Sequence, residues 1–221
     1  MQLKVLLILN KKHNNKFFMQ SNTGDLKTIR EMMEKSTKFL SLNGLSLVFA
    51  GIIALVGATF AHIFLLHDYA FTNFDHIADV RTLLLLADAL VILALAVGVI
   101  TFFCWQKSKK NHQSLFNSVT RRAAYNLLVP LAAGGVFSLL LLLRGDIALV
   151  AATTLIFYGL ALFCASKYTF SEIHFLGICE ITVGLLAVIF PYHGILFWAI
   201  GFGILHIIFG FIMWKKYELC R

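Results

Sequence analysis

Six long apolar stretches constrain this chain more than any other feature. Each is close to or above the roughly 20 apolar residues that an α-helix needs to cross the hydrocarbon core of a bilayer. Composition agrees, because only 14% of the 221 residues are charged, against about 25% in soluble domains. The sequence therefore predicts an all-α, polytopic membrane bundle of six transmembrane helices in three hairpins. We place the spans at Phe39–Leu66, Thr82–Trp105, Ala123–Leu143, Ile147–Ser166, Ile173–Phe190 and Ile195–Trp214.

The distribution of Lys and Arg predicts an orientation. Seventeen of the 19 basic residues flank the spans on one side, and only Arg81 and Arg144 fall on the other. By the positive-inside rule, both termini are expected in the cytoplasm. The basic residues form no separate polar domain, so the net charge of +8 is explained by topology. We therefore expect the lipid bilayer, and no nucleic acid, as partner.

Two short segments precede the predicted transmembrane domain at residues 39–214, and one follows it. Residues 1–24 are expected to be flexible. Their apolar start is short and lacks a small-residue cleavage site, so translation could begin there or at Met19. Residues 25–38 place Leu26, Ile29 and Met33 near one face and charges elsewhere, which predicts an amphipathic helix on the cytoplasmic side of the membrane. Residues 215–221 form a cytoplasmic tail.

Two ionisable residues lie deep inside the last two apolar stretches. Glu180 and His206 are almost equally far from the turn at Pro191–Gly194, so both are expected near the middle of the membrane. Each falls on the small-residue face of its helix, the face expected to pack inward. An unpaired charge at this depth is costly. The sequence therefore predicts that Glu180 and His206 face each other, either as a structural clamp or as a proton-titrating site.

Other ionisable residues lie nearer to the predicted outer face. Asp88 is an intramembrane carboxylate in the second span, where it could reach toward the outer interface or meet His62. The first outer loop combines histidines with carboxylates, a mixture that can bind a divalent metal or titrate with pH; a solvated loop is the simpler interpretation. These loop residues are His67, Asp68, Asp75, His76 and Asp79.

Small residues recur at helical spacing in the first, fifth and last spans. Glycines seven positions apart, and alanines four apart in the first span, let helix backbones approach closely in a membrane. We expect these residues to mark helix contacts, with a substrate path along them as the minor alternative. They are Gly44, Gly51, Ala54, Ala58, Gly177, Gly184, Gly203 and Gly210.

Several chemistries lack a sequence signal. The four cysteines, Cys104, Cys164, Cys179 and Cys220, show no metal-ligand spacing and lie toward the predicted cytoplasmic side, so free thiols are expected. No hydrolase, kinase or phosphate-loop motif is visible. We therefore expect no enzyme activity, catalytic residue, metal or cofactor.

Three segments carry a resemblance to known proteins. "STKFLSLNGLSLVFAGIIALVGA" (36–58), "LIFYGLALFCASKYT" (155–169) and "FWAIGFGILHIIFG" (197–210) resemble a family of uncharacterised bacterial six-span integral membrane proteins. The resemblance implies a six-span inner-membrane protein and brings no activity with it. The last hairpin, with paired glycines on both sides of Pro191, is similar to the short repeat of bacterial acid-resistance membrane proteins. The other two hairpin turns lack that proline.

Two functional hypotheses follow. The first is a small proton-linked transporter or channel-like stress protein, because intramembrane ionisable residues are rare and usually functional. The second is a membrane sensor or scaffold, in which the N-terminal helix and the basic loop hold a cytoplasmic protein partner. Neither hypothesis decides whether the chain forms a homo-oligomer.

Overall fold

A computed structural model of the chain describes residues 43–66, 80–110 and 118–219. All regular structure in these residues is helical, and six helices are long and apolar enough to cross a membrane. The predicted fold class, an all-α bundle of six membrane-spanning helices, is therefore confirmed, and the protein is a multi-pass membrane protein. The predicted helix at residues 25–38 lies outside the described residues.

The first three spans are largely single α-helices. α2 covers Gly44–Phe60 and continues as the π-helix η1, Ala61–Leu66. α3 covers Val80–Lys110, and α4 covers Ser118–Leu143. A tight turn follows α4, in which Gly145 adopts φ 82°, a conformation that glycine tolerates best.

The last three spans combine α-helix with short 3₁₀ and π segments. The fourth consists of η2 (Ile147–Leu149), α5 (Val150–Ala165) and η3 (Ser166–Tyr168). The fifth is α6 (Ser171–Ile189). The sixth consists of η4 (Pro191–His193), α7 (Gly194–Trp198), η5 (Ala199–Leu205), α8 (His206–Trp214) and η6 (Lys215–Leu219).

The helices extend beyond the predicted spans at several ends. α3 continues to Lys110, α4 begins at Ser118, and helical structure after α8 continues to Leu219. The predicted boundaries followed hydropathy, which falls where a helix reaches the polar interface, although the backbone hydrogen bonds continue there. These extensions carry basic side chains, so the helices are longer than the apolar spans predicted from hydropathy.

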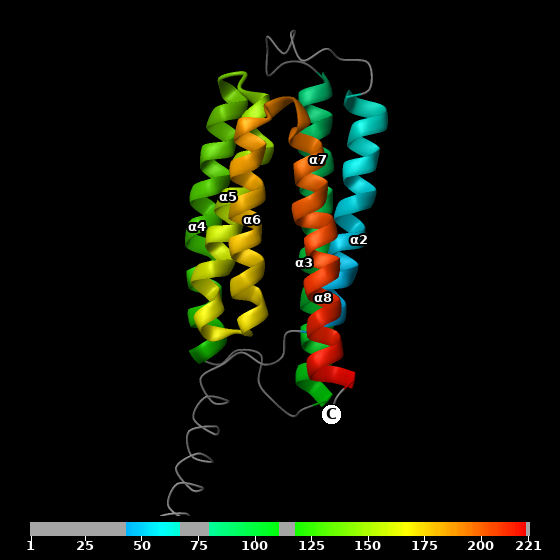
Figure 1. The fold of residues 1–221 in the computed structure, drawn as a ribbon, viewed down its shortest axis with the longest axis vertical. Coiled ribbons are helices and arrows are strands. Elements are labelled where there is room, and N and C mark those ends of the chain that lie inside the picture. The colour runs from blue at the N-terminus through cyan, green and yellow to red at the C-terminus, as the bar shows by residue number, and fades with distance from the viewer. Residues whose placement is uncertain (1–42, 67–79, 111–117, 220–221) are drawn as a thin grey trace, which may run out of the picture. The chain divides into compact units, whose positions relative to one another are not determined.

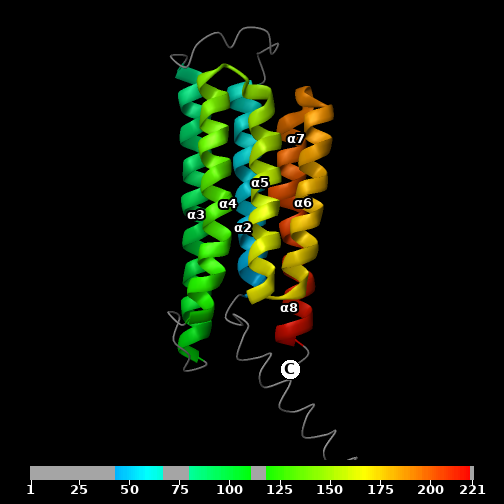
Figure 2. The ribbon, with the colours of Figure 1, turned by 90° about the vertical axis from the view of Figure 1, so that its left-hand side faces the viewer.

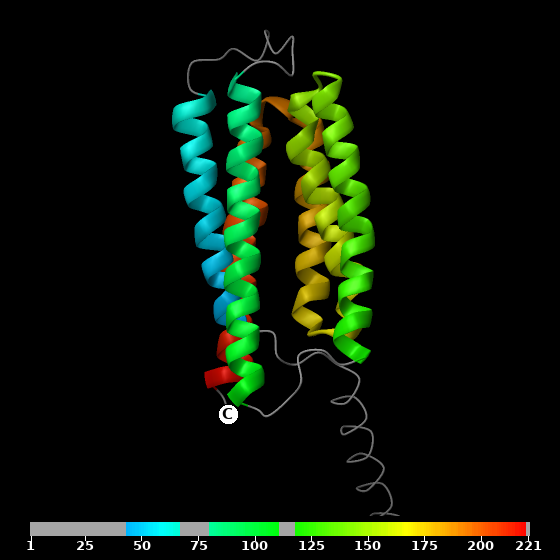
Figure 3. The ribbon, with the colours of Figure 1, turned by 180° about the vertical axis from the view of Figure 1, so that it is seen from behind.

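Neighbouring spans form two groups of helices. α5 packs against both α4 and α6, and α2 packs against α3 and along η5 and α8. Figures 1 and 3 show the two groups joined where α6 lies beside the last span. In the turned view of Figure 2, α6 and α7 remain neighbours. The contacts of α5 and α6 with the last span therefore form the boundary between the groups.

The predicted small-residue stripes lie at helix contacts. A Cβ added at Gly177 would lie 2.8 Å from the carbonyl oxygen of Gly159, and one at Gly210 would lie 2.8 Å from that of Gly44. Gly51 and Gly203 meet in the same contact between α2 and the last span. Ala54 and Ala58 are also buried. The glycines allow backbone to approach backbone, as close packing between membrane helices requires.

Two apolar clusters form the interior. Cluster 1 contains Leu47, Leu162, Phe170, Ile173, Leu176 and Met213. Cluster 2 contains Ala152, Leu155 and Ala187, with Val183, Phe197, Trp198 and Phe202 packed against them. Cluster 1 lies toward the end of the bundle where α2 begins and η6 ends, called here the C-terminal end, and cluster 2 lies toward the opposite end. The candidate site lies between them.

Candidate functional site

Glu180 and His206 meet in the interior of the bundle. Glu180 is completely buried in α6, and His206, at the start of α8, is only 4% exposed. The carboxylate Oε1 of Glu180 lies 3.3 Å from Nδ1 of His206. The predicted contact is therefore present, and it joins the two groups of helices across their boundary.

The hydrogen bonds of His206 go to other partners. Its Nδ1 lies 3.1 Å from the carbonyl oxygen of Gly201, and because a carbonyl can only accept, Nδ1 must carry a proton. Its Nε2 lies 2.8 Å from the hydroxyl of Tyr158 in α5. Nε2 accepts from this hydroxyl when the imidazole is neutral and donates to it when the imidazole is charged.

Glu180 is left without a hydrogen bond from the described residues. The contact with His206 is within ion-pair distance, but the Nδ1 proton is directed at Gly201, and neither carboxyl oxygen accepts a hydrogen bond in this part of the chain. Burying a carboxylate in this way is expensive, and so is burying a protonated carboxyl without an acceptor. The carboxyl group is therefore buried at a cost in either protonation state.

Local backbone geometry creates this arrangement. Ala199–Leu205 is a π-helical stretch immediately before His206, and such stretches are frequent at functional sites. Gly203, His206 and Gly210, which the sequence places on the inward face, are all buried. Gly201 is also buried, beside Glu180, because a π turn holds more residues than the α turn assumed.

Gly201 is needed for the close approach of Glu180. A Cβ at this position would lie 2.6 Å from Oε2 of Glu180 and 2.4 Å from Cδ2 of Leu155. Both of those side chains are fully buried, so neither has room to move aside. Glycine therefore supplies both the space for the carboxyl group and the carbonyl that holds the imidazole.

Apolar packing closes the site on both sides. Tyr158 packs against cluster 1, and Phe202 belongs to the surroundings of cluster 2. The ring centroid of Phe202 lies 4.9 Å from that of Tyr158 and 6.0 Å from that of His206. The ring of Trp198 lies 4.8 Å from that of Phe202. The site is thus a small polar group enclosed by aromatic and aliphatic side chains.

A second buried carboxylate, Glu172, lies at the C-terminal end of the bundle. Its Oε1 is 2.6 Å from Nζ of Lys216, and the hydroxyl of Tyr217 lies 3.2 Å from Oε1 and 3.0 Å from Oε2. The hydroxyl of Ser171 is 3.3 Å from Oε2. Unlike Glu180, this carboxylate has several donors around it.

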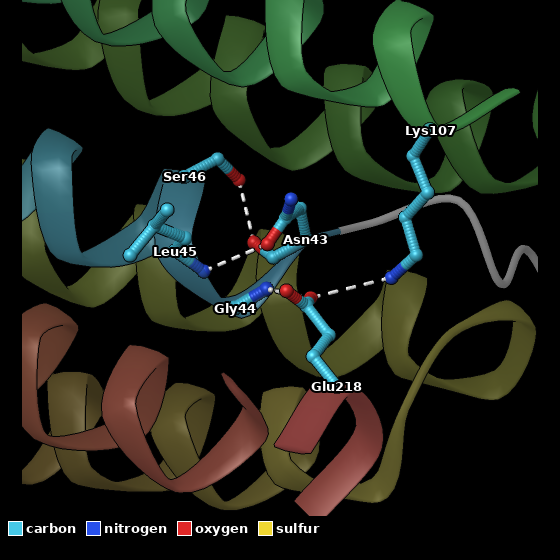
Figure 4. A network of polar contacts seen from close by, with 6 residues as sticks. All are labelled: Asn43, Gly44, Leu45, Ser46, Lys107 and Glu218. Carbon is cyan, nitrogen blue, oxygen red and sulfur yellow. Dashed lines mark hydrogen bonds and ion pairs between the residues drawn. The ribbon is translucent and has the colours of Figure 1, made fainter. Parts of the chain in front are cut away.

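The same C-terminal segment also contacts α2 and α3 (Figure 4). Oε1 of Glu218 accepts a hydrogen bond from the backbone nitrogen of Gly44 at 3.2 Å and lies 3.4 Å from Nζ of Lys107. Asn43 completes the cap of α2, since its Oδ1 accepts from the nitrogen of Leu45 at 2.9 Å. A carboxylate at a helix N-terminus is favourable because the free N–H groups there carry partial positive charge.

The remaining predicted site residues do not join these clusters. Asp88 is half-buried on α3 near Gly57, while His62 is exposed, and the described contacts do not pair them. The predicted outer-loop site at His67, Asp68, Asp75, His76 and Asp79 lies outside the described residues. In the part of the chain that the structure describes, no group of three or more His, Cys, Asp or Glu side chains could hold a metal.

The cysteines are separate from the site. Cys104 is buried, Cys164 and Cys179 are partly buried, and all three are free thiols. Cys220 lies outside the described residues.

Comparisons with known proteins supply no relative from which to transfer a function. No protein-family model matches the chain, and neither the curated proteins nor the solved structures contain a match. The resemblance to the bacterial six-span family and to the acid-resistance repeat therefore stays a prediction, and the function must be argued from the site itself.

Proposed function

We propose that this protein is a non-enzymatic, proton-linked transporter in which Glu180, His206 and Tyr158 form the proton-binding site. The observation that carries the proposal is the fully buried Glu180 carboxyl group, which lies beside an imidazole but accepts no hydrogen bond from the described residues. Ionisable side chains inside a membrane are costly and commonly mark ion and proton pathways.

The position of the site favours a transporter over an open channel. Cluster 1 and cluster 2 enclose the site toward the two ends of the bundle, so a proton reaches it only when one of these clusters opens. In transporters that work by alternating access, two groups of helices rock about a site at their boundary. Glu180 and His206 join two such groups here.

Charge supports an orientation with the C-terminal end in the cytoplasm of a bacterial cell. Basic side chains gather at this end of the described bundle, on α3, α4, η3 and η6, whereas Arg144 lies at the opposite turn. By the positive-inside rule, this distribution supports both termini on the cytoplasmic side, and the resemblance to bacterial membrane proteins supports an inner membrane.

A proton jump tests the proposal directly. Purified protein in proteoliposomes on a solid-supported membrane should give a transient current when the bath changes from about pH 8 to about pH 4, the range in which carboxylates and imidazoles titrate. Glu180→Gln keeps the shape of the side chain but cannot ionise, so the current should disappear. Asp88→Asn is the control, because it removes an intramembrane carboxylate on α3 that lies near Gly57 and away from the site, and it should retain the current.

Fluorescence separates proton binding from proton movement. Trp198 is one of three tryptophans and contacts Phe202, which borders the site. With Trp105 and Trp214 replaced by Phe, its emission should change with pH in the parent protein but not in Glu180→Gln. Wild-type protein with neither current nor pH-dependent emission would reduce the pair to a structural clamp. Emission without current would favour the sensor hypothesis.

A further inference from the structure

The C-terminal segment Lys215–Leu219 contacts both groups of helices. It continues from α8, and through Glu218 it reaches the N-terminus of α2 and Lys107 of α3. Lys216 and Tyr217 contact Glu172, which begins α6 in the other group. One short segment therefore bridges the boundary between the groups at the C-terminal end of the bundle.

The two attachments of this segment are unequal. On the side of α2 and α3, the segment is the covalent continuation of α8, and α8 packs along α2 through glycines. Its connection to α6 consists of side-chain contacts, and the Lys216 side chain is 55% exposed. If the groups separate at this end, the contacts of Glu172 are expected to break first.

Cluster 1 lies between this bridge and the proton site. Tyr217 packs against cluster 1 from the C-terminal end, and Tyr158 packs against it from the site. Leu176, only 1% exposed, is one helical turn from both Glu172 and Glu180 on α6, since the three positions are four residues apart. Movement of α6 away from the last span at this end would therefore expose Leu176 before Glu180.

We propose that Glu172, Lys216 and Tyr217 form a latch that closes the C-terminal access path to the Glu180–His206 site. While the latch is formed, cluster 1 stays packed and the site is sealed from this end. When it opens, water reaches Leu176 and then the site. The passage of protons through the open latch rests on the proposed function, whereas the opening of the latch does not.

Thiol labelling measures the opening without reference to protons. The reporter is Leu176→Cys in a chain whose four native cysteines are replaced, held in lipid nanodiscs and exposed to a charged maleimide that does not enter lipid. The thiol should react slowly while the latch is formed. Lys216→Met should raise the labelling rate about fivefold or more, at the upper end of what an ion pair with one exposed partner contributes.

A neighbouring lysine provides the matched control. Lys215 is exposed and lies next to Lys216 in η6, so Lys215→Met removes the same charge without touching Glu172 and should leave the labelling rate unchanged. The swapped pair Glu172→Lys with Lys216→Glu should restore slow labelling. Glu172→Gln provides a second way to open the latch while keeping the side-chain size, in case Lys216→Met fails to fold.

The results separate the latch from the proposed function. Fast labelling of the reporter in the unaltered background, or equal rates for Lys216→Met and Lys215→Met, would overturn the latch. Faster labelling in Lys216→Met together with no proton-jump current in wild-type protein would leave the latch standing and remove the transporter.

Discussion

Glu172 and Glu180 are two buried carboxylates on the same helix, about two turns apart, with opposite surroundings. Glu172 is approached by donors from Lys216, Tyr217 and Ser171. Glu180 has an imidazole at 3.3 Å, but it accepts no hydrogen bond from the described residues. Burial alone therefore does not decide how a carboxylate is stabilised.

The difference follows from which partners can reach each residue. Glu172 lies near the end of the bundle, where long polar side chains extend from the polar interface. Glu180 is surrounded mostly by small and apolar residues, and the nearby imidazole of His206 already donates to the carbonyl of Gly201. Glu172 is consequently stabilised in its charged form, whereas a change in protonation at Glu180 must alter the contacts around it.

The largest expected effect comes from removing one partner at each carboxylate. His206→Leu leaves Glu180 buried without an ionisable neighbour and should lower the free energy of unfolding by about 3–5 kcal/mol. Lys216→Met leaves Tyr217 and Ser171 on Glu172 and removes a half-exposed side chain, so its cost should be about 1 kcal/mol or less. Unfolding titrations with SDS in mixed micelles measure both free energies.

A double variant checks the cause of this difference. Glu180→Gln in the His206→Leu background removes the ionisable group that lost its neighbour and should recover part of the lost stability, because contacting residues are not additive. If the two substitutions add without interaction, or if Lys216→Met is as costly as His206→Leu, the contrast between the two carboxylates is wrong.

Gly201 offers an intermediate effect that is specific to Glu180. Gly201→Ala would place Cβ 2.6 Å from Oε2 of Glu180 and 2.4 Å from Leu155, and overpacking of this kind costs about 1–3 kcal/mol. Gly98→Ala is the control, because no atom lies within 4 Å of a Cβ at that exposed position. The same SDS titration should show a loss for Gly201→Ala alone; equal stability of the two variants would mean that the site is loosely packed.

Much of this arrangement could be predicted from the sequence. The six spans, the turn at Pro191 and the facing of Glu180 and His206 depend on hydropathy, helical period and depth from a turn, which are local properties. The inward faces of α6 and α8 followed from their spaced glycines. These signals are strong because a bilayer permits few alternatives to a straight helix.

The rest required tertiary information. Tyr158 lies in an apolar span without a periodic signal, and only the packing of α5 against the last span brings its hydroxyl to His206. Gly201 was missed because the π-helical stretch changes the register of the helix. Glu172 and Glu218 were missed because their partners, Lys216 and Gly44, are distant in sequence. The sequence signal that could have indicated Glu172 and Glu218 is a carboxylate at a helix end together with basic residues in the tail.

The smallest expected difference in stability is between the two tyrosine variants, one at each carboxylate. Tyr158→Phe removes the partner of His206 Nε2, so a buried ring nitrogen loses its hydrogen bond, and stability should fall by about 1–3 kcal/mol when the group is left unpaired. Because the lost hydroxyl contacts His206 of the proposed proton site, the pH midpoint of Trp198 emission should also move. Tyr217→Phe should cost about 0.5–1.5 kcal/mol, since Lys216 and Ser171 still contact Glu172, and should leave that midpoint unchanged. A midpoint that moves equally in both variants would show that the two clusters titrate as one system, and the separation between a structural and a functional carboxylate on α6 would then have to be abandoned.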